Sequence, residues 1–131
     1  MGNINLLAVF LAAAAFFAVG ALWYGVLFGK PWQRETGISD PPQGAQVLKI
    51  MGLTFAFELL VCLMLGHNIA RTSPVPHVIM MIAVGFGLTI MTPAIGINYL
   101  HQRKSLTLFL VDAGHFLVGM AAAGAVFVAF A

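Results

Sequence analysis

Residues Ile4 to Phe28 read INLLAVFLAAAAFFAVGALWYGVLF, a run of 25 residues without a charged side chain. About 20 helical residues cross the hydrocarbon core of a bilayer, which is roughly 30 Å thick. The run is therefore long enough to span a membrane. No Lys or Arg precedes it, and it is too long for the apolar part of a signal peptide. We therefore expect a retained transmembrane helix.

The composition of the whole chain agrees with a membrane protein. Of the 131 residues, 61% are hydrophobic and 8% are charged, whereas soluble domains carry roughly 25% charged residues. The mean hydropathy is +0.99. The net charge of +2 comes from basic residues beside apolar runs, which is typical of membrane orientation and argues against a nucleic-acid partner. The one cysteine, Cys62, excludes an internal disulfide.

Four apolar runs predict an all-α integral membrane four-helix bundle that forms a single transmembrane domain over residues 1–131. The expected spans are about 4–28, 47–68, 77–100 and 106–131. The Pro41-Pro42 pair and several glycines exclude a continuous helix in the first loop, residues 29–46. Pro93, near the middle of the third span, predicts a kink there.

The basic residues predict the orientation of the chain. Five of the six lie on the side of the first and third loops: Lys30, Arg34, Lys49, Arg103 and Lys104. Arg71 is alone on the side of the second loop and the two termini. Because cytoplasmic loops carry an excess of Lys and Arg, both termini are expected to face away from the cytoplasm of a cell inner membrane.

The most specific string is ALWYGVLFGKPW, residues 21–32, followed by Thr36-Gly37. Its Trp-Tyr pair, Phe-Gly-Lys step and second Trp resemble the domain-of-unknown-function 1761 family of short, mostly bacterial membrane proteins. The resemblance extends more loosely over the whole chain, through its length, its four spans and the string Asp112-Ala113-Gly114-His115 in the last span. In that family a Pro often follows the position after the Tyr, where this chain has Gly25-Val26. The resemblance implies a four-helix inner-membrane protein and no particular activity.

Acidic and imidazole side chains inside the spans predict a polar site. A charge at the bilayer centre costs about 2.5–3.5 kcal/mol on insertion scales, so such side chains usually face the bundle interior. Asp112 and His115 are three residues apart and share a helix face. At about 1.5 Å rise per residue, the second, third and fourth spans place polar residues at overlapping depths. The predicted intramembrane site is Glu58, Asp112, His115, Thr54, Thr89 and Thr92.

Polar and aromatic residues near the basic side predict a cytoplasmic mouth to this site. Its members are Trp23, Tyr24, Asn98 and Tyr99. In the third span the residues Gly85, Thr89, Thr92, Gly96, Tyr99 and Arg103 follow the spacing of one helix face. The threonines of this stripe also suit packing, because Ser and Thr hydroxyls often bond to their own helix.

The histidines beside the second loop suggest a metal site more weakly. His67 and His77 flank the second loop with methionines nearby, and Met and His ligands suit copper. Both residue types are also common in apolar helices and at interfaces, so we expect no metal and no cofactor. The buried acids and His115 have a purely structural alternative as well, since they can bridge helices.

Three functions remain open from the sequence. The favoured one is a proton-linked transporter or channel, acting as a homo-oligomer on an ion or small molecule, with Glu58 as the titrating carboxylate and Asp112 and His115 as relay partners. The second is a non-enzymatic accessory or assembly subunit of a membrane complex. The third, an intramembrane enzyme acting on a lipid or quinone through Asp112 and His115, ranks last because no nucleophile or metal constellation supports it.

Overall fold

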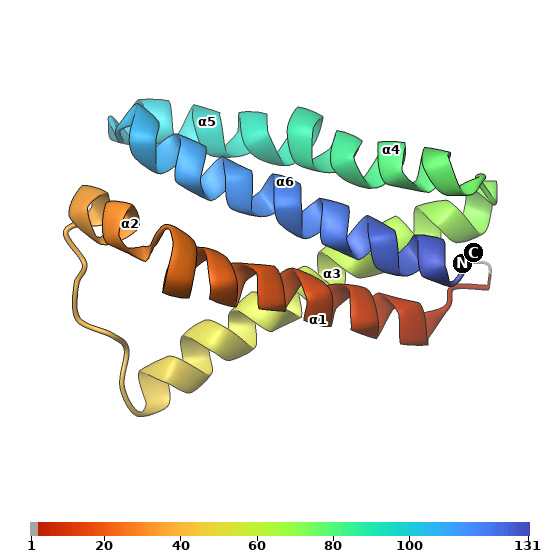
Figure 1. Ribbon diagram of the computed structural model, residues 1–131, viewed down its shortest axis with the longest axis horizontal. Helices are drawn as coiled ribbons and strands as arrows, with labels where there is room; N and C mark the ends of the chain where they lie inside the picture. Colours follow the sequence, from red (N-terminus) through yellow and green to blue (C-terminus); the bar gives the residue numbers. More distant parts are fainter. Residues whose placement is uncertain (1–2) are drawn as a thin grey trace.

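The computed structural model describes residues 3–131 and is built from helices joined by short connections, with no strand in that range (Figure 1). Four helical stretches are long and apolar enough, by length and composition, to cross a membrane. They are Leu6–Leu27, Ala45–Thr72, Pro76–Gln102 and Leu106–Ala129. The predicted all-α architecture with four spans is thereby confirmed, while the sides on which the termini lie stay a prediction.

Two of the four stretches change their helical winding part-way. The first consists of α1 (Leu6–Leu22) and a π-helical turn, η1 (Trp23–Leu27). The third consists of α4 (Pro76–Phe86), a π-helical turn, η2 (Gly87–Met91), and α5 (Thr92–Gln102). The turn η2 lies just before Pro93, where the sequence predicts a kink, and closes with the Thr92 amide donating to the Gly87 carbonyl. The second and fourth stretches are α3 (Ala45–Thr72) and α6 (Leu106–Ala129).

The first loop contains a helix that the sequence did not predict. After η1 the chain forms α2 (Gly29–Thr36), with Pro31 in its first turn. Proline is tolerated there because backbone N–H groups of the first turn have no acceptor within the helix. The helix ends at Gly37, whose φ of 74° lies in the left-handed region that glycine adopts without strain. Only the segment from residue 37 to 44, with Pro41-Pro42, is irregular.

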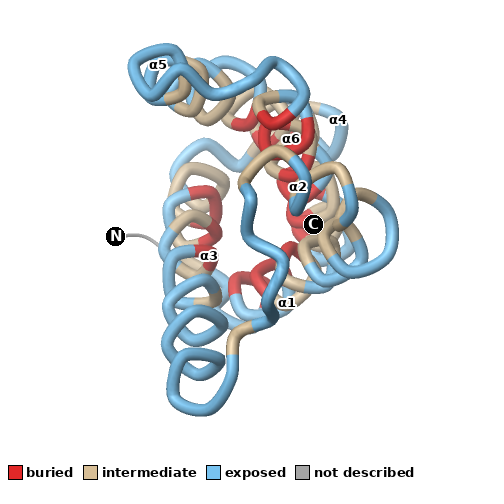
Figure 2. The backbone as a smooth tube through the Cα atoms, turned by 90° about the vertical axis from the view of Figure 1, so that its left-hand side faces the viewer, coloured by how far each residue is buried: buried red, intermediate tan, exposed pale blue. Residues whose placement is uncertain are grey.

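The helix α6 is the centre of the bundle. It packs on one side against α1 and on the other against α4 and α5, and α3 crosses behind them and contacts chiefly α1 (Figure 1). The start of α1 and the end of α6 lie at one end of the bundle, and α2 lies at the opposite end. The buried residues follow α1, α6 and the second half of α3 (Figure 2). Every residue of α3 from Ala45 to Thr54 is exposed.

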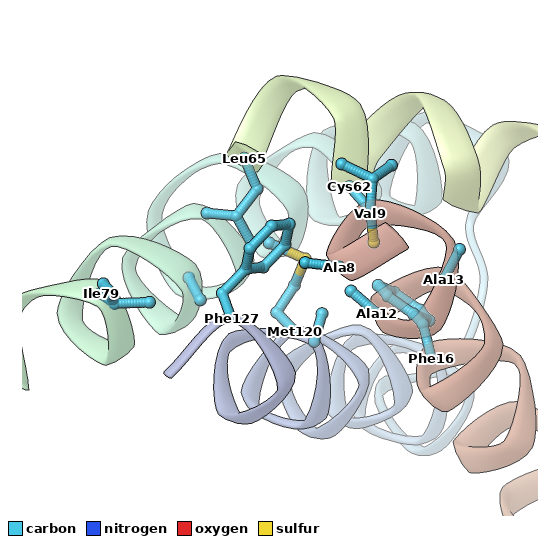
Figure 3. Close-up of a cluster of buried hydrophobic side chains, with 12 residues drawn as sticks. Ala8, Val9, Ala12, Ala13, Phe16, Cys62, Leu65, Ile79, Met120 and Phe127 are labelled. Atoms are coloured by element: carbon cyan, nitrogen blue, oxygen red, sulfur yellow. The ribbon is translucent and has the colours of Figure 1, made fainter. Parts of the chain in front are cut away.

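Small side chains allow these helices to approach closely. At the core, Ala8, Ala12 and Ala13 of α1 are fully buried against larger side chains of α3 and α6 (Figure 3). The larger members of the core are Phe16 of α1 itself, Cys62 and Leu65 of α3, and Met120 and Phe127 of α6. Association of membrane helices depends on such close packing, because lipid tails are as apolar as the helix surfaces. The core therefore fixes α1 against α6, and this pair carries the polar cluster described next.

Candidate functional site

A carboxyl group on α6 joins two other segments near the end of the bundle that carries α2. Asp112 is 8% exposed. The Tyr24 hydroxyl, from η1, donates to its Oδ1 at 2.6 Å, and the Tyr99 hydroxyl, from α5, donates to its Oδ2. Both carboxyl oxygens thus accept a hydrogen bond from a phenol. We call Tyr24, Asp112 and Tyr99 the tyrosine clamp.

Residues next to Tyr24 and Asp112 form further contacts between η1 and α6. The indole Nε1 of Trp23 donates to the Val111 carbonyl oxygen at 2.8 Å. A Cβ atom at Gly114 would lie 2.8 Å from Cζ2 of Trp23, so only a glycine leaves room for the indole. Trp-Tyr and Asp-Ala-Gly-His, the most specific strings of the sequence, therefore meet across the interface of the first and fourth spans.

The π-helical turn η1 places two consecutive side chains on α6. The Phe28 amide donates to the Trp23 carbonyl at 2.7 Å, a bond that spans five residues. An inserted residue of this kind marks π-bulges, which occur frequently at functional sites. In this chain both Trp23 and Tyr24 reach α6 from the widened turn. The π-helical turn thus positions Tyr24 in the tyrosine clamp.

His115 lies three residues after Asp112 and is buried without a hydrogen bond. It is 7% exposed, and neither ring nitrogen has a partner. Aromatic rings surround it, with ring centroids at 4.9 Å for Phe116, 5.0 Å for Tyr24 and 5.6 Å for Phe16. A Cβ at Gly20 would lie 3.0 Å from its Nε2. The imidazole therefore fills a space that Gly20 leaves open on α1.

Glu58 is buried on a different helix. It is 5% exposed, and its Oε2 has no hydrogen-bond partner. It lies on α3, one turn before the buried Cys62. Within residues 3–131, no hydrogen bond or ion pair joins Glu58 to Asp112 or His115. The structure thus connects Asp112 with the tyrosines, places His115 beside them, and leaves Glu58 as a separate buried acid.

The three threonines of the predicted site do not bond to this cluster. Thr89 donates its hydroxyl to the Gly85 carbonyl at 2.6 Å, and Thr92 donates to the Gly87 carbonyl at 2.7 Å. Both bonds stay within the third span, which is the back-bonding typical of threonine in helices. Thr54 is exposed on the first half of α3. Among the predicted mouth residues, Asn98 is exposed as well.

The remaining candidates lie away from the tyrosine clamp. His77 is exposed and His67 is half-buried, and over residues 3–131 no group of three or more His, Cys, Asp or Glu side chains could hold a metal ion. An apolar groove of about 330 Å³ lies between α3 and the α4–η2 stretch. A second hollow, of about 290 Å³, lies at the end with the chain termini. Neither hollow is lined by Asp112 or His115.

Comparison with known sequences places the chain in a family. Residues 7–128 match the family described as Protein of unknown function (DUF1761). The chain belongs to this family. The matched range includes both Trp23-Tyr24 and Asp112–His115, as the resemblance of these strings implied. Searches of the curated proteins and of the solved structures gave no significant match.

The clamp in this DUF1761 chain was not predicted, although its residues were. The sequence placed Tyr24 and Tyr99 at a mouth and Asp112 deeper, as two separate groups. A signal was present, because Tyr99 lies three residues before the end of α5 and Asp112 six residues after the start of α6, so the tight turn between them places both in the same end of neighbouring helices. The same reasoning could not find the role of Gly114, since the indole that occupies its space comes from another helix.

Removal of the Tyr24 or Tyr99 hydroxyl should lower the stability of this DUF1761 protein measurably. Tyr24→Phe and Tyr99→Phe each remove one interhelical hydrogen bond, and we expect each to lower the free energy of unfolding by about 1–2 kcal/mol. The double variant should lose more than the sum, because the carboxyl group is then buried without any donor. Unfolding in detergent by titration with dodecyl sulfate measures the change.

Thr89→Val is the matched control for these two variants. It also removes a hydroxyl from a helix, but the bond that it removes stays within the third span. We expect it to change the free energy of unfolding little. If the two Tyr→Phe variants were as stable as this control, the clamp would contribute nothing to the packing of α1 and α5 on α6.

Proposed function

We propose that this protein is a small multi-pass transporter or channel of a cell inner membrane, in which the buried His115 accepts and releases a proton as an ion or small molecule crosses. One observation carries the proposal. The imidazole is 7% exposed, and both of its nitrogens lack a hydrogen-bond partner. An imidazole that served only to bridge helices would donate or accept at least one bond to a neighbouring helix.

The energetic cost of this arrangement supports a role in a working cycle. A buried donor or acceptor left without a partner costs about 1–3 kcal/mol. Unpaired groups of this kind in native structures call for an explanation, such as a catalytic or binding role. An imidazole can accept a proton at one ring nitrogen and donate one from the other, which a proton relay requires. A proton, a water molecule or a small hydrogen-bonding ligand would satisfy the ring.

The other polar residues take separate roles in this proposal. Asp112 is held by both phenols and thereby positions the Tyr24 ring beside the His115 imidazole. Glu58, also without a partner for Oε2, is a second proton-accepting group on α3. The basic end of the bundle faces the cytoplasm, so a proton reaches His115 from that side past Tyr24 and Tyr99.

A second candidate function has its own supporting observations. Both oxygens of Asp112 are paired between helices, as expected of a group that fixes helix positions. The first ten residues of α3, from Ala45 to Thr54, are all exposed and could pack against another subunit. These features suit an accessory subunit of a membrane complex or a homo-oligomer. The homo-oligomer is compatible with either function.

Proton flux in reconstituted vesicles tests the transport proposal. Purified protein is placed in liposomes that contain a pH-sensitive dye, and a potassium diffusion potential drives protons inward. The parent should acidify the lumen faster than protein-free vesicles do. His115→Phe keeps an aromatic ring in the cluster but removes the titrating nitrogens, and it should reduce the flux to the protein-free level.

His101→Phe is the matched control for this experiment. His101 is exposed near the end of α5, and its Nδ1 lies 3.0 Å from the Ile97 carbonyl of its own helix. This variant should keep the flux of the parent. A parent protein without flux above protein-free vesicles would contradict transport and favour the accessory role. Equal flux from the parent and His115→Phe would remove His115 from the pathway.

A further inference from the structure

Most of the charge of the chain is concentrated at one end of the bundle. Of the ten charged residues, seven lie in or beside the first and third loops: Lys30, Arg34, Glu35, Asp40, Lys49, Arg103 and Lys104. Five are basic and two acidic, so this end carries a net charge of +3. Figure 1 shows α2, the start of α3 and the turn between α5 and α6 at this same end. A positive patch on a membrane protein at the level of the headgroups matches an anionic surface.

The short helix α2 has two different faces at this end. Lys30, Gln33 and Arg34 are exposed, whereas Pro31 and Trp32 are half-buried. The Trp32 ring contacts Tyr24, with ring centroids 6.0 Å apart. A helix with basic residues on one side and an aromatic residue on the other is typical of helices that lie in the plane of the membrane interface. Tryptophan is also enriched at the level of the headgroups.

We propose that α2 docks on the anionic phospholipid headgroups of its own bilayer, with Lys30 and Arg34 as the contacting residues. Arg103 and Lys104, exposed in the turn that follows α5, add positive charge at the same end of the bundle. The partner is thus a lipid surface that carries phosphate and net negative charge. This inference is independent of proton transport, because it concerns lipid binding alone.

Docking of α2 would also affect the tyrosine clamp, because α2 contacts Tyr24. Gly29, the first residue of α2, approaches the Tyr24 carbonyl so closely that a Cβ atom would overlap the oxygen. Trp32, one turn later, packs on the Tyr24 ring. The start of α2 is therefore fixed relative to Tyr24, which bonds Asp112. Headgroups that hold α2 in place thereby also hold Tyr24 on Asp112.

A spin label on α2 tests the docking directly. The full chain carries Gln33→Cys with a nitroxide label and is reconstituted in phosphatidylcholine nanodiscs with or without phosphatidylglycerol. Cys62 is fully buried, and the parent chain, treated with the same reagent, controls for labelling there. The measurements are label mobility and accessibility to an aqueous nickel chelate. Phosphatidylglycerol should lower both, and high salt should reverse the effect, because salt screens exposed charges.

Two further variants make the result decisive. Lys30→Gln combined with Arg34→Gln should shift the docked-to-undocked ratio by roughly thirtyfold, the effect expected for two basic residues at an anionic surface. Arg71→Gln, which removes a charge at the opposite end of the bundle, should respond to phosphatidylglycerol as the parent does. The proposal is overturned if the label behaves identically in both lipid mixtures, or if the double variant responds as fully as the parent.

Discussion

Asp112→Ala should lower the free energy of unfolding by about 2–4 kcal/mol, since one carboxyl group accepts hydrogen bonds from two other segments and each bond contributes about 1–2 kcal/mol. The change leaves the hydroxyls of Tyr24 and Tyr99 without their acceptor. It also removes the bond from α5 to α6 and leaves η1 held on α6 by the Trp23 indole alone among its side-chain hydrogen bonds. No other single substitution in the tyrosine clamp removes both contacts.

Asp112→Asn separates the loss of an acceptor from the loss of the side chain. Its amide oxygen can still accept from one phenol, so about half of the destabilisation should remain. Unfolding in detergent by dodecyl sulfate, followed by circular dichroism, gives both values. Asp40→Ala, at an exposed acid in the first loop, is the control and should leave stability unchanged. Asp112→Ala with the stability of this control would show that the clamp is not a structural contact.

The four spans could be predicted because the residues of each apolar run are enough to make it a membrane-spanning helix. The run from Ile4 to Phe28 contains no charge, and a bilayer allows such a run only one hydrogen-bonded form, the helix. The helix α2 escaped prediction since the Pro41-Pro42 pair and the glycines of the first loop indicate turns. Its position depends on the packing of Trp32 on Tyr24, a contact that the sequence pattern does not contain.

The sequence named the three residues of the tyrosine clamp and His115, but not the contacts among them. The spacing of Asp112 and His115 places them on one face of a helix, and the structure has them there. Glu58 has a similar predicted depth, yet depth does not determine which helices meet. The helix α3 packs chiefly on α1, so Glu58 is buried without a bond to that pair. The π-helical turn η1, which brings Trp23 and Tyr24 to α6, also depends on contacts between helices.

Gly119→Ala should strongly destabilise the packing of α1 on α6, although it replaces only a single hydrogen by a methyl group. A Cβ atom at Gly119 would lie 2.6 Å, 2.7 Å and 2.9 Å from three atoms of the Phe16 ring. That ring is fully buried and packs edge-on against His115 and Phe116, with centroids at 5.6 Å and 6.0 Å. The ring or one of the two helices must therefore move to admit the methyl group. Overpacking of this kind typically costs about 1–3 kcal/mol and occasionally more.

Gly85→Ala is the matched control, because a Cβ there meets nothing within 4 Å. Alanine is the better helix former by roughly 1 kcal/mol in water, so this control should be neutral or slightly stabilising when thermal unfolding is followed in detergent.

The double variant Gly119→Ala with Phe16→Leu tests whether the contact with the ring is the cause. If the clash with the ring is the reason for the loss, the smaller side chain should restore part of the stability, so that the double variant is less destabilised than the sum of the single ones. Strict additivity would show that the loss of stability in Gly119→Ala does not come from the contact with the Phe16 ring.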